Sequence, residues 1–308
     1  MHNKNNTLAF FAGLVSAFIF GFSFLFSKKA LVSAAPLELI SFRFLTGLLV
    51  MTVLLFFKVI KVNYKGKNLK GLFFLGFMEP VIYFIFETYG IKFSTSSQAG
   101  LMISLIPIFV VIFSSYFLKE KPSKLQLIFI FLSVGGVMFI GLMSSSDSSN
   151  GSLLGIALLL GAVISASAFI IISRKLSTEF TPIELTYSMM IEGAFVFNIL
   201  YLISLLKNNS ISSYFKPLHN TNFIISIVYL GVFSSIVAYF LLNYTISELD
   251  ASKSSVIANI STIVSIFAGI IFLNESFEYY HIIGSIMIIT GVWGTNYLST
   301  KRIEKQLN

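Results

Sequence analysis

The sequence predicts an all-α integral membrane protein of ten transmembrane helices, arranged as two inverted five-helix repeats. Three observations predict this fold: an excess of apolar residues, ten apolar runs of membrane-spanning length, and a duplicated pattern along the chain. Of the 308 residues, 56% are hydrophobic and 11% are charged. These polar side chains are too few to cover a soluble protein of this size, so lipid must surround much of the chain.

A helix that crosses the hydrocarbon core needs about 20 mostly apolar residues. Ten segments meet this requirement, at roughly 8–27, 37–57, 71–91, 96–118, 125–143, 152–173, 183–206, 222–244, 253–273 and 279–299. Polar or charged stretches separate them, such as KVIKVNYKGKNLK after Phe57 and SSSDSSNG after Met143. The breaks are short, so we expect no soluble domain.

Local signals mark where several spans begin or bend. The second and seventh spans start at Pro36 and Pro182, and each proline is followed two residues later by a glutamate, a combination that favours a helix N-terminus. Pro80 falls inside the third span, where it removes a backbone hydrogen bond and bends the helix.

The distribution of charge predicts the orientation of the chain. The formal net charge is +8, from 21 Lys and Arg against 13 Asp and Glu. If the N-terminus is inside, 15 basic residues fall in cytoplasmic segments and five in external ones, while Arg43 lies within a span. Basic residues gather on the cytoplasmic side of membrane proteins, so we expect N-in and C-in topology. The same interpretation argues against nucleic acid as a partner.

The chain repeats itself. FLKE, ending at Glu120, closes the fourth apolar run, and FLNE, ending at Glu275, closes the ninth. A shift of 155 residues aligns these ends without a gap from Leu75 to Val137, and a shift of 146 aligns the spans before them. The repeats cover 8–143 and 152–299 and hold five spans each. An odd number of spans makes the second repeat inverted, an arrangement typical of transporters that open a midplane site to each side in turn.

Several short motifs resemble the drug/metabolite transporter superfamily, in particular the ten-helix EamA type. The features that carry the likeness are Pro36 with Arg43 in the pattern P-x-x-x-x-x-x-R-F, Pro107 in the fourth span, the F-L-x-E ends at Glu120 and Glu275, and the G-V pairs at Gly136 and Gly291. The likeness extends from about Leu8 to Leu298. In the second half, Met189 stands at the position of Arg43 and Thr262 at that of Pro107.

The resemblance implies a multi-pass protein of the bacterial cytoplasmic membrane that moves small solutes without a cofactor. Members of the superfamily transport amino acids, other metabolites, nucleotide sugars or toxic cations, and bacterial EamA-type proteins are often exporters. The expected partners are therefore a small-molecule solute and the lipid bilayer, with protons as a candidate coupling ion and the oligomeric state open.

Charged residues inside the spans are the first candidates for the site, because a charge at the bilayer centre costs about 2.5–3.5 kcal/mol. Glu79, Tyr83 and Glu87 follow one another at four-residue spacing and so share one face of the third span. Our hypothesis is that this face lines the solute path, with Glu79 as a proton site or as the counter-charge to a cationic or zwitterionic solute. The alternative is a purely structural salt bridge between Glu79 and Arg43.

Glu192 lies well inside the seventh span, and the matching residue of the first repeat is Thr46. Two interpretations stay open for Glu192: it pairs with Arg43 across the two halves, or it is a second protonation site.

A second polar lining is predicted on the eighth and ninth spans. Ser235, Tyr239 and Asn243 recur every four residues, and Asn259 is the repeat partner of Ser104. Such residues would place polar groups at equivalent depth in both halves. Small and hydroxylated residues also allow helices to pack closely and to hydrogen-bond to one another, which is the competing explanation for each of them.

Other function classes fit the sequence less well. The three histidines lie in the tail, a loop and a helix boundary, and there is no Cys and no H-E-x-x-H motif, which argues against a metal site and against an enzyme. We therefore predict a secondary transporter that exports a small metabolite, such as an amino acid or a related amine or organic solute, by alternating access. The alternatives are a membrane-embedded enzyme and an uncoupled facilitator or pore.

Overall fold

The computed structural model describes residues 2–93, 102–103, 105–119, 122–144, 153–273 and 278–307, and this part of the chain contains helices and no β-strand. Before residue 150 the helices are α1 (His2–Leu31), α2 (Pro36–Phe56), α3 (Lys70–Gly76), η1 (Phe77–Ile82), α4 (Tyr83–Phe93), α6 (Ile106–Phe113), η2 (Ser114–Leu118) and α7 (Lys124–Ser144). After it they are α8 (Leu153–Leu176), α9 (Pro182–Lys207), η4 (Ile211–Ser213), η5 (Lys216–His219), α10 (Thr221–Val228), η6 (Tyr229–Ala238), α11 (Tyr239–Glu248), α12 (Ala251–Ala258), α13 (Ile260–Leu273) and α14 (Tyr279–Leu307).

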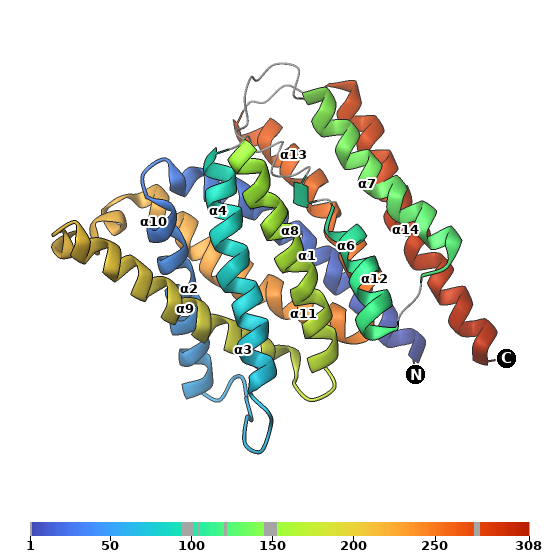
Figure 1. Cartoon of the computed structure of the whole chain (residues 1–308), viewed down its shortest axis with the longest axis horizontal. Coiled ribbons are helices and arrows are strands. Elements are labelled where there is room, and N and C mark those ends of the chain that lie inside the picture. The colour runs from blue at the N-terminus through green and yellow to red at the C-terminus, as the bar shows by residue number, and fades with distance from the viewer. Residues whose placement is uncertain are drawn as a thin grey trace.

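The helices pack into one bundle (Figure 1). Within the described residues, six helical segments are long and apolar enough to cross a membrane: Asn6–Leu31, Pro36–Phe56, Lys70–Phe93, Leu154–Leu176, Pro182–Lys207 and Thr221–Glu248. Two further apolar helices are shorter, at Ile106–Leu118 and Lys124–Gly136. A helix lies in the described part of every predicted apolar run, although Glu120 and Glu275, which end the two duplicated motifs, lie outside the described residues.

The third spanning segment is interrupted near its middle. Glu79 has non-helical backbone angles, φ −144° and ψ 113°, and Pro80 follows it. The carbonyl oxygen of Met78, beside this break, accepts a hydrogen bond of 2.6 Å from the Ser165 hydroxyl of α8. A side chain from a neighbouring helix thus satisfies backbone that the break would leave unpaired in a membrane. The duplicate of this segment contains η6, so both repeats carry wide helical turns at the same repeat position.

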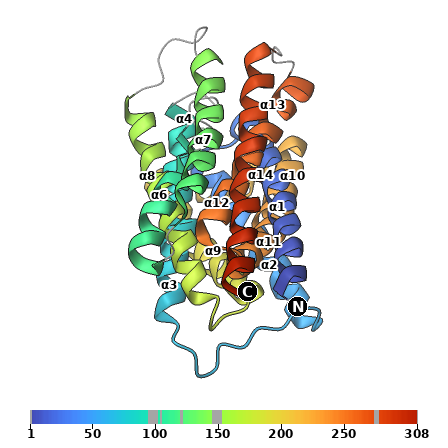
Figure 2. The same cartoon turned by 90° about the vertical axis from the view of Figure 1, so that its right-hand side faces the viewer.

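Glycines allow close and reciprocal contacts between helices from the two repeats. Gly47 of α2 packs against Met190 of α9, and Gly193 of α9 packs against Phe44 of α2. The shift of 146 residues exchanges these two contacts. In the same reciprocal way, Gly136 of α7 packs against Met287 of α14, and Gly291 of α14 packs against Ser133 of α7. These two helices lie side by side at one edge of the bundle (Figure 1, Figure 2).

A matched pair of glycine variants tests this packing. A Cβ at residue 193 would lie 2.6 Å from the Phe44 ring and 2.9 Å from Pro80, and neither side chain can easily move away. A Cβ at residue 47 would lie 2.7 Å from the sulfur of Met190, a flexible side chain. We expect Gly193→Ala to destabilise the protein by about 1–3 kcal/mol and Gly47→Ala to destabilise it less. Thermal unfolding of both variants in detergent measures this order; equal losses would contradict the packing.

One loop between α2 and α3 is fastened to the start of α9. Lys67 forms a salt bridge of 2.8 Å with Glu184, whose other carboxylate oxygen accepts a hydrogen bond from the Asn63 backbone N–H. The Tyr64 hydroxyl donates to the Glu184 carbonyl. Burial, and to a smaller extent the charge of Glu184, raises the pKa of Tyr64. The hydroxyl therefore keeps its proton and its hydrogen bond well into the alkaline range. The loop lies at the same end of the bundle as both chain termini (Figure 2).

Candidate functional site

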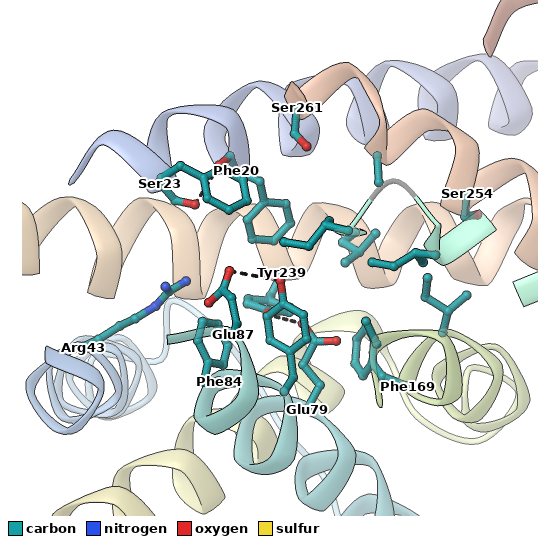
Figure 3. A pocket seen from close by; sticks show the side chains of 18 residues that line it. Phe20, Ser23, Arg43, Glu79, Phe84, Glu87, Phe169, Tyr239, Ser254 and Ser261 are labelled. Atoms are coloured by element: carbon teal, nitrogen blue, oxygen red, sulfur yellow. Dashed lines mark hydrogen bonds between the residues drawn. The ribbon is translucent and has the colours of Figure 1, made fainter. Parts of the chain in front are cut away.

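A cavity of about 90 Å³ lies at the break in the third spanning segment. Its polar lining residues are Ser23, Arg43, Glu79, Tyr83, Glu87, Tyr239, Ser254 and Ser261. Its apolar lining residues are Phe20, Phe24, Phe84, Ile103, Ile106, Ala166, Phe169, Ile170, Leu242 and Ala258. Helices from before and after residue 150 therefore both contribute to the cavity (Figure 3).

Arg43 supplies the positive charge of the cavity. Its side chain comes from α2 and is buried. It donates two hydrogen bonds of 2.8 Å to serines of η6, from Nε to Ser235 Oγ and from Nη2 to Ser234 Oγ. Its guanidinium also lies 4.3 Å from the centre of the Phe84 ring, a cation–π contact. No carboxylate of the described residues lies within 4.0 Å of Arg43. The structural salt bridge to Glu79 and the pairing with Glu192, both considered from the sequence, are therefore not formed here.

Glu79 is the carboxylate at the helix break. Its Oε1 accepts a hydrogen bond from the Tyr239 hydroxyl of α11, and both side chains are buried. Phe20 and Phe169 hold the Tyr239 ring edge-on, with ring centres at 5.1 Å and 6.2 Å. Because residues on α1 and α8 fix the ring, the Tyr239 hydroxyl is aimed at Glu79 in an aromatic setting. Among the described residues, the acid at the break thus has one hydrogen-bond donor positioned toward it.

Glu87 is the second carboxylate of the cavity and lies two turns further along α4. Its Oε1 accepts a hydrogen bond of 3.1 Å from the Tyr83 hydroxyl. Figure 3 shows the Glu87 carboxylate and the Arg43 guanidinium pointing toward each other, and their charges interact through space without a direct ion pair. The third span therefore presents Glu79, Tyr83 and Glu87 to one cavity, the face that their spacing predicts.

The other predicted residues lie elsewhere. Asn243 is buried outside the cavity, where it accepts from Ser173 of α8 and donates to Thr186 of α9. Asn259 donates to Ser133 of α7 at 3.1 Å. Both side chains therefore join helices, which is the competing explanation that the sequence left open. Ser235 holds Arg43 and does not line the cavity itself, Glu192 lies at another helix seam, and Ser104 falls outside the described residues.

Several lining residues carry no clear signal in the sequence. Ser254 and Ser261 of α12 and α13, and the aromatic residues Phe20 and Phe169, are common residue types in a chain so rich in Ser and Phe. Ser234 is different, because the shift of 155 residues pairs it with Glu79. Comparing the two repeats at their break would have drawn attention to Ser234, although not to its contact with Arg43.

The chemistry of the cavity suits binding. One guanidinium, two carboxylates and two phenol hydroxyls face a space with aromatic walls, so the cavity offers both charges and hydrogen-bond donors and acceptors. In the described part of the chain, no three His, Asp or Glu side chains gather in a way that could hold a metal ion. A cavity with a few convergent polar groups is typical of a small-molecule binding site.

Comparison with known proteins identifies the family. The model of the EamA-like transporter family matches residues 7–142 and again residues 153–297. The chain belongs to the EamA-like transporter family. It is thus a multi-pass membrane transporter of the drug/metabolite transporter superfamily, as its motifs predict.

Curated relatives of this EamA-family chain are also named transporters. The chain is 38% identical over 305 residues to the uncharacterized transporter YcxC of Bacillus subtilis, covering 99% of this chain and 98% of that protein. It is 29% identical to an uncharacterized transporter of Archaeoglobus fulgidus, covering 89% of this chain and 93% of that protein. These names describe transport and not catalysis.

A solved structure supports the fold of this EamA-family chain. A crystal structure of a protein that is 14% identical superposes with a TM-score of 0.76, covering 94% of this chain and 98% of that one. At this identity the likeness concerns the fold alone. The fold of the chain is therefore one that has been observed experimentally.

Proposed function

We propose that this EamA-family transporter exports a small zwitterionic metabolite, such as an amino acid, by alternating access between two inverted five-helix halves. The halves are residues 8–143 and 152–299, and both chain ends lie in the cytoplasm of a bacterial cell. Protons are the coupling ion, and Glu79 is the carboxyl that carries them.

The reciprocal helix contacts support the inverted repeat. The pair Gly47 with Met190 and the pair Gly193 with Phe44 exchange when the two repeats are exchanged, as a two-fold relation requires. The interrupted third segment and η6 match in the same way. Two halves that pack so alike can also exchange conformations, which is the physical basis of alternating access.

One observation carries the substrate class: opposite charges line the same cavity. The Arg43 guanidinium, already turned into the cavity by two serine hydroxyls, matches a carboxylate. Glu79 and Glu87 match an ammonium group from the other side. With the coupling proton on Glu79, one charge of each sign remains in the cavity, on Arg43 and Glu87. A solute that bears both groups would match both signs, whereas a simple amine or a simple acid would match only one.

The size of the cavity favours a compact solute in this conformation. A buried water needs about 10–15 Å³, so 90 Å³ holds roughly six to nine water-sized groups. This is enough for a carboxylate, an ammonium group and a short side chain. An aromatic side chain would need a wider cavity, because a ring the size of benzene occupies an apolar cavity of about 150 Å³. We expect small aliphatic amino acids to fit this state best.

Thermal stabilisation of the detergent-solubilised protein tests the substrate class. The probes are matched in size: alanine as the zwitterion, propionate as the acid and ethylamine as the amine. We expect the zwitterion to raise the melting temperature most, because a ligand at 100 times its Kd adds about 2.7 kcal/mol of stability. Equal or greater stabilisation by the amine alone would contradict a zwitterion site, and no stabilisation by any compact amino acid would contradict the proposal as a whole.

A further inference from the structure

Glu192 is an intramembrane acid that lies outside the polar cavity. Counted along α9 (Pro182–Lys207), it lies about 4 Å from the midpoint of the helix at 1.5 Å per residue. Its side chain is partly buried and is absent from the cavity lining. Substrate binding in the cavity therefore gives no reason for a carboxyl group at this position.

The carboxyl group of Glu192 occupies a notch in α3. A Cβ at Gly76 would overlap both carboxyl oxygens and the carbon between them, so only glycine leaves room for the group. The next residue of α9, Gly193, packs against Pro80, directly after the helix break at Glu79. The Glu192 carboxyl thus lies about one helical turn from the break, on the outer side of the same helix.

No charged group neutralises Glu192. Within the described residues it has no hydrogen-bond or ion-pair partner, and Lys70, the charged residue of α3, is exposed at the far end of that helix. On α2, Arg43 is bound to two serines, and on η1, Glu79 is bound to Tyr239. On α9 itself, Glu184 is paired with Lys67 at the start of the helix.

The surroundings of the notch face the lipid. Phe195, one turn along α9, is 68% exposed, and Phe73, one turn before Gly76 on α3, is 60% exposed. An ionised carboxylate between such apolar side chains lacks a counter-charge, so the neutral acid is the form that this position favours.

The other repeat shows that helix packing does not require this acid. Thr46 of α2, the counterpart of Glu192, packs on Gly231 of η6, the counterpart of Gly76. The Cβ and the methyl group of a neutral threonine therefore complete the equivalent seam. The carboxyl group at residue 192 is an addition that serves some purpose other than closing the two helices together.

We propose that Glu192 is a proton-binding site on the lipid-facing seam between α3 and α9, separate from the carboxylates of the cavity. The neutral acid fits the notch at Gly76, and ionisation draws the carboxyl out of it toward water. Because the notch lies one turn from the break at Glu79, occupancy of the site changes how α3 is held beside the cavity. The site depends on no solute, so it can be tested apart from the proposed transport function.

Labelling with a hydrophobic carbodiimide tests the site. Dicyclohexylcarbodiimide dissolves in the bilayer and reacts with a protonated carboxyl: the acid oxygen bonds to the central carbodiimide carbon, and the acid proton passes to one nitrogen. The O-acylisourea then rearranges to a stable N-acylurea, so the labelled peptide gains the mass of one whole carbodiimide and nothing leaves. Protein in liposomes is treated between pH 5 and pH 9, and the peptide that contains Glu192 is quantified by mass spectrometry.

We expect Glu192 to be labelled at least tenfold faster by this reagent than by a water-soluble carbodiimide, with a rate that falls as the pH rises. Gly76→Ala should change the rate at least threefold, because its Cβ displaces the carboxyl, while Gly71→Ala on the same helix, whose Cβ meets only the flexible end of Leu176, should leave it unchanged. Glu192→Gln should abolish the label at this peptide and serves as the blank. Slow labelling of the native protein at every pH, with ready labelling after denaturation, would overturn the proposal, as would equal rates for the two reagents.

Discussion

Replacing Arg43 by methionine is expected to weaken solute binding by roughly 30- to 1,000-fold, which corresponds to about 2–4 kcal/mol of lost charge-assisted hydrogen bonding. Methionine is the natural residue at the repeat-equivalent position, Met189, so the variant makes the two halves alike at this point. The expected loss is large because the guanidinium is the one positive charge in the described cavity lining. A solute carboxylate that enters the variant would find no counter-charge.

The measurement is the affinity for the zwitterion that stabilises the wild-type protein, compared with the matched amine that lacks its carboxylate. Binding of the amine should change much less, because Arg43 would interact with the carboxylate alone. Arg43→Lys is the conservative control: it keeps the charge, but a single ammonium lacks the planar fork that reaches Ser234 and Ser235 together. We expect it to recover part of the affinity. An Arg43→Met variant that binds the zwitterion within threefold of wild type would remove Arg43 from the site.

The sequence predicts those residues of the candidate site whose charge is energetically costly to place inside a membrane span. Arg43, Glu79 and Glu87 interrupt apolar runs, and a charge inside a membrane span needs a reason to be there. The spacing of the third span also places Glu79, Tyr83 and Glu87 on one face, and all three line the cavity. Burial cost selected the three charged residues, and the helical period relates Tyr83 to Glu87 within α4, whereas Glu79 lies at the helix break, where the period does not hold.

The polar stripe of the eighth span shows where such reasoning stops. Ser235, Tyr239 and Asn243 would share a face in a uniform helix, but this span contains the wide turns of η6, which change the rotation per residue. Ser235 lies within η6 and binds Arg43, whereas Tyr239, at the start of α11, lines the cavity. Asn243 lies one regular turn further along α11, beyond the cavity, where it joins α8 to α9. A four-residue spacing predicts a face only while the helix keeps its period, and a local wide turn has no reliable signal in one sequence.

The partner of Arg43 could not be predicted for a related reason. Several acidic and hydroxyl groups lie within the spans, and which of them meets the guanidinium depends on how α2 rotates against η6. The contact of Gly231 with Thr46 and with the backbone of Arg43 brings these two helices very close. That approach places Ser234 and Ser235 within reach of the guanidinium. The decisive information lies in the packing of helices from different repeats, which no local pattern contains.

Replacing Glu79 by glutamine is expected to abolish proton-driven accumulation of the solute while leaving solute exchange in place. Glutamine keeps the shape of the side chain and an oxygen that can accept from the Tyr239 hydroxyl, so the helix break should persist. What the variant loses is a group that can bind and release a proton in a dehydrated site. The loss of uphill transport should exceed tenfold, because exchange needs only binding and the conformational change.

Proteoliposomes separate these two activities. An imposed pH gradient should drive the wild-type protein to accumulate labelled solute, whereas counterflow against unlabelled solute needs no gradient and should persist in Glu79→Gln. Glu87→Gln is the matched control, since it removes the other carboxylate of the same cavity, and we expect it to weaken solute binding while accumulation still follows the pH gradient. Accumulation by Glu79→Gln at the wild-type level would move proton coupling to another group. A wild-type protein that only equilibrates the solute, with the same rate at every gradient, would be an uncoupled facilitator, and the carboxylate at the break would then serve to bind the ammonium group of the solute.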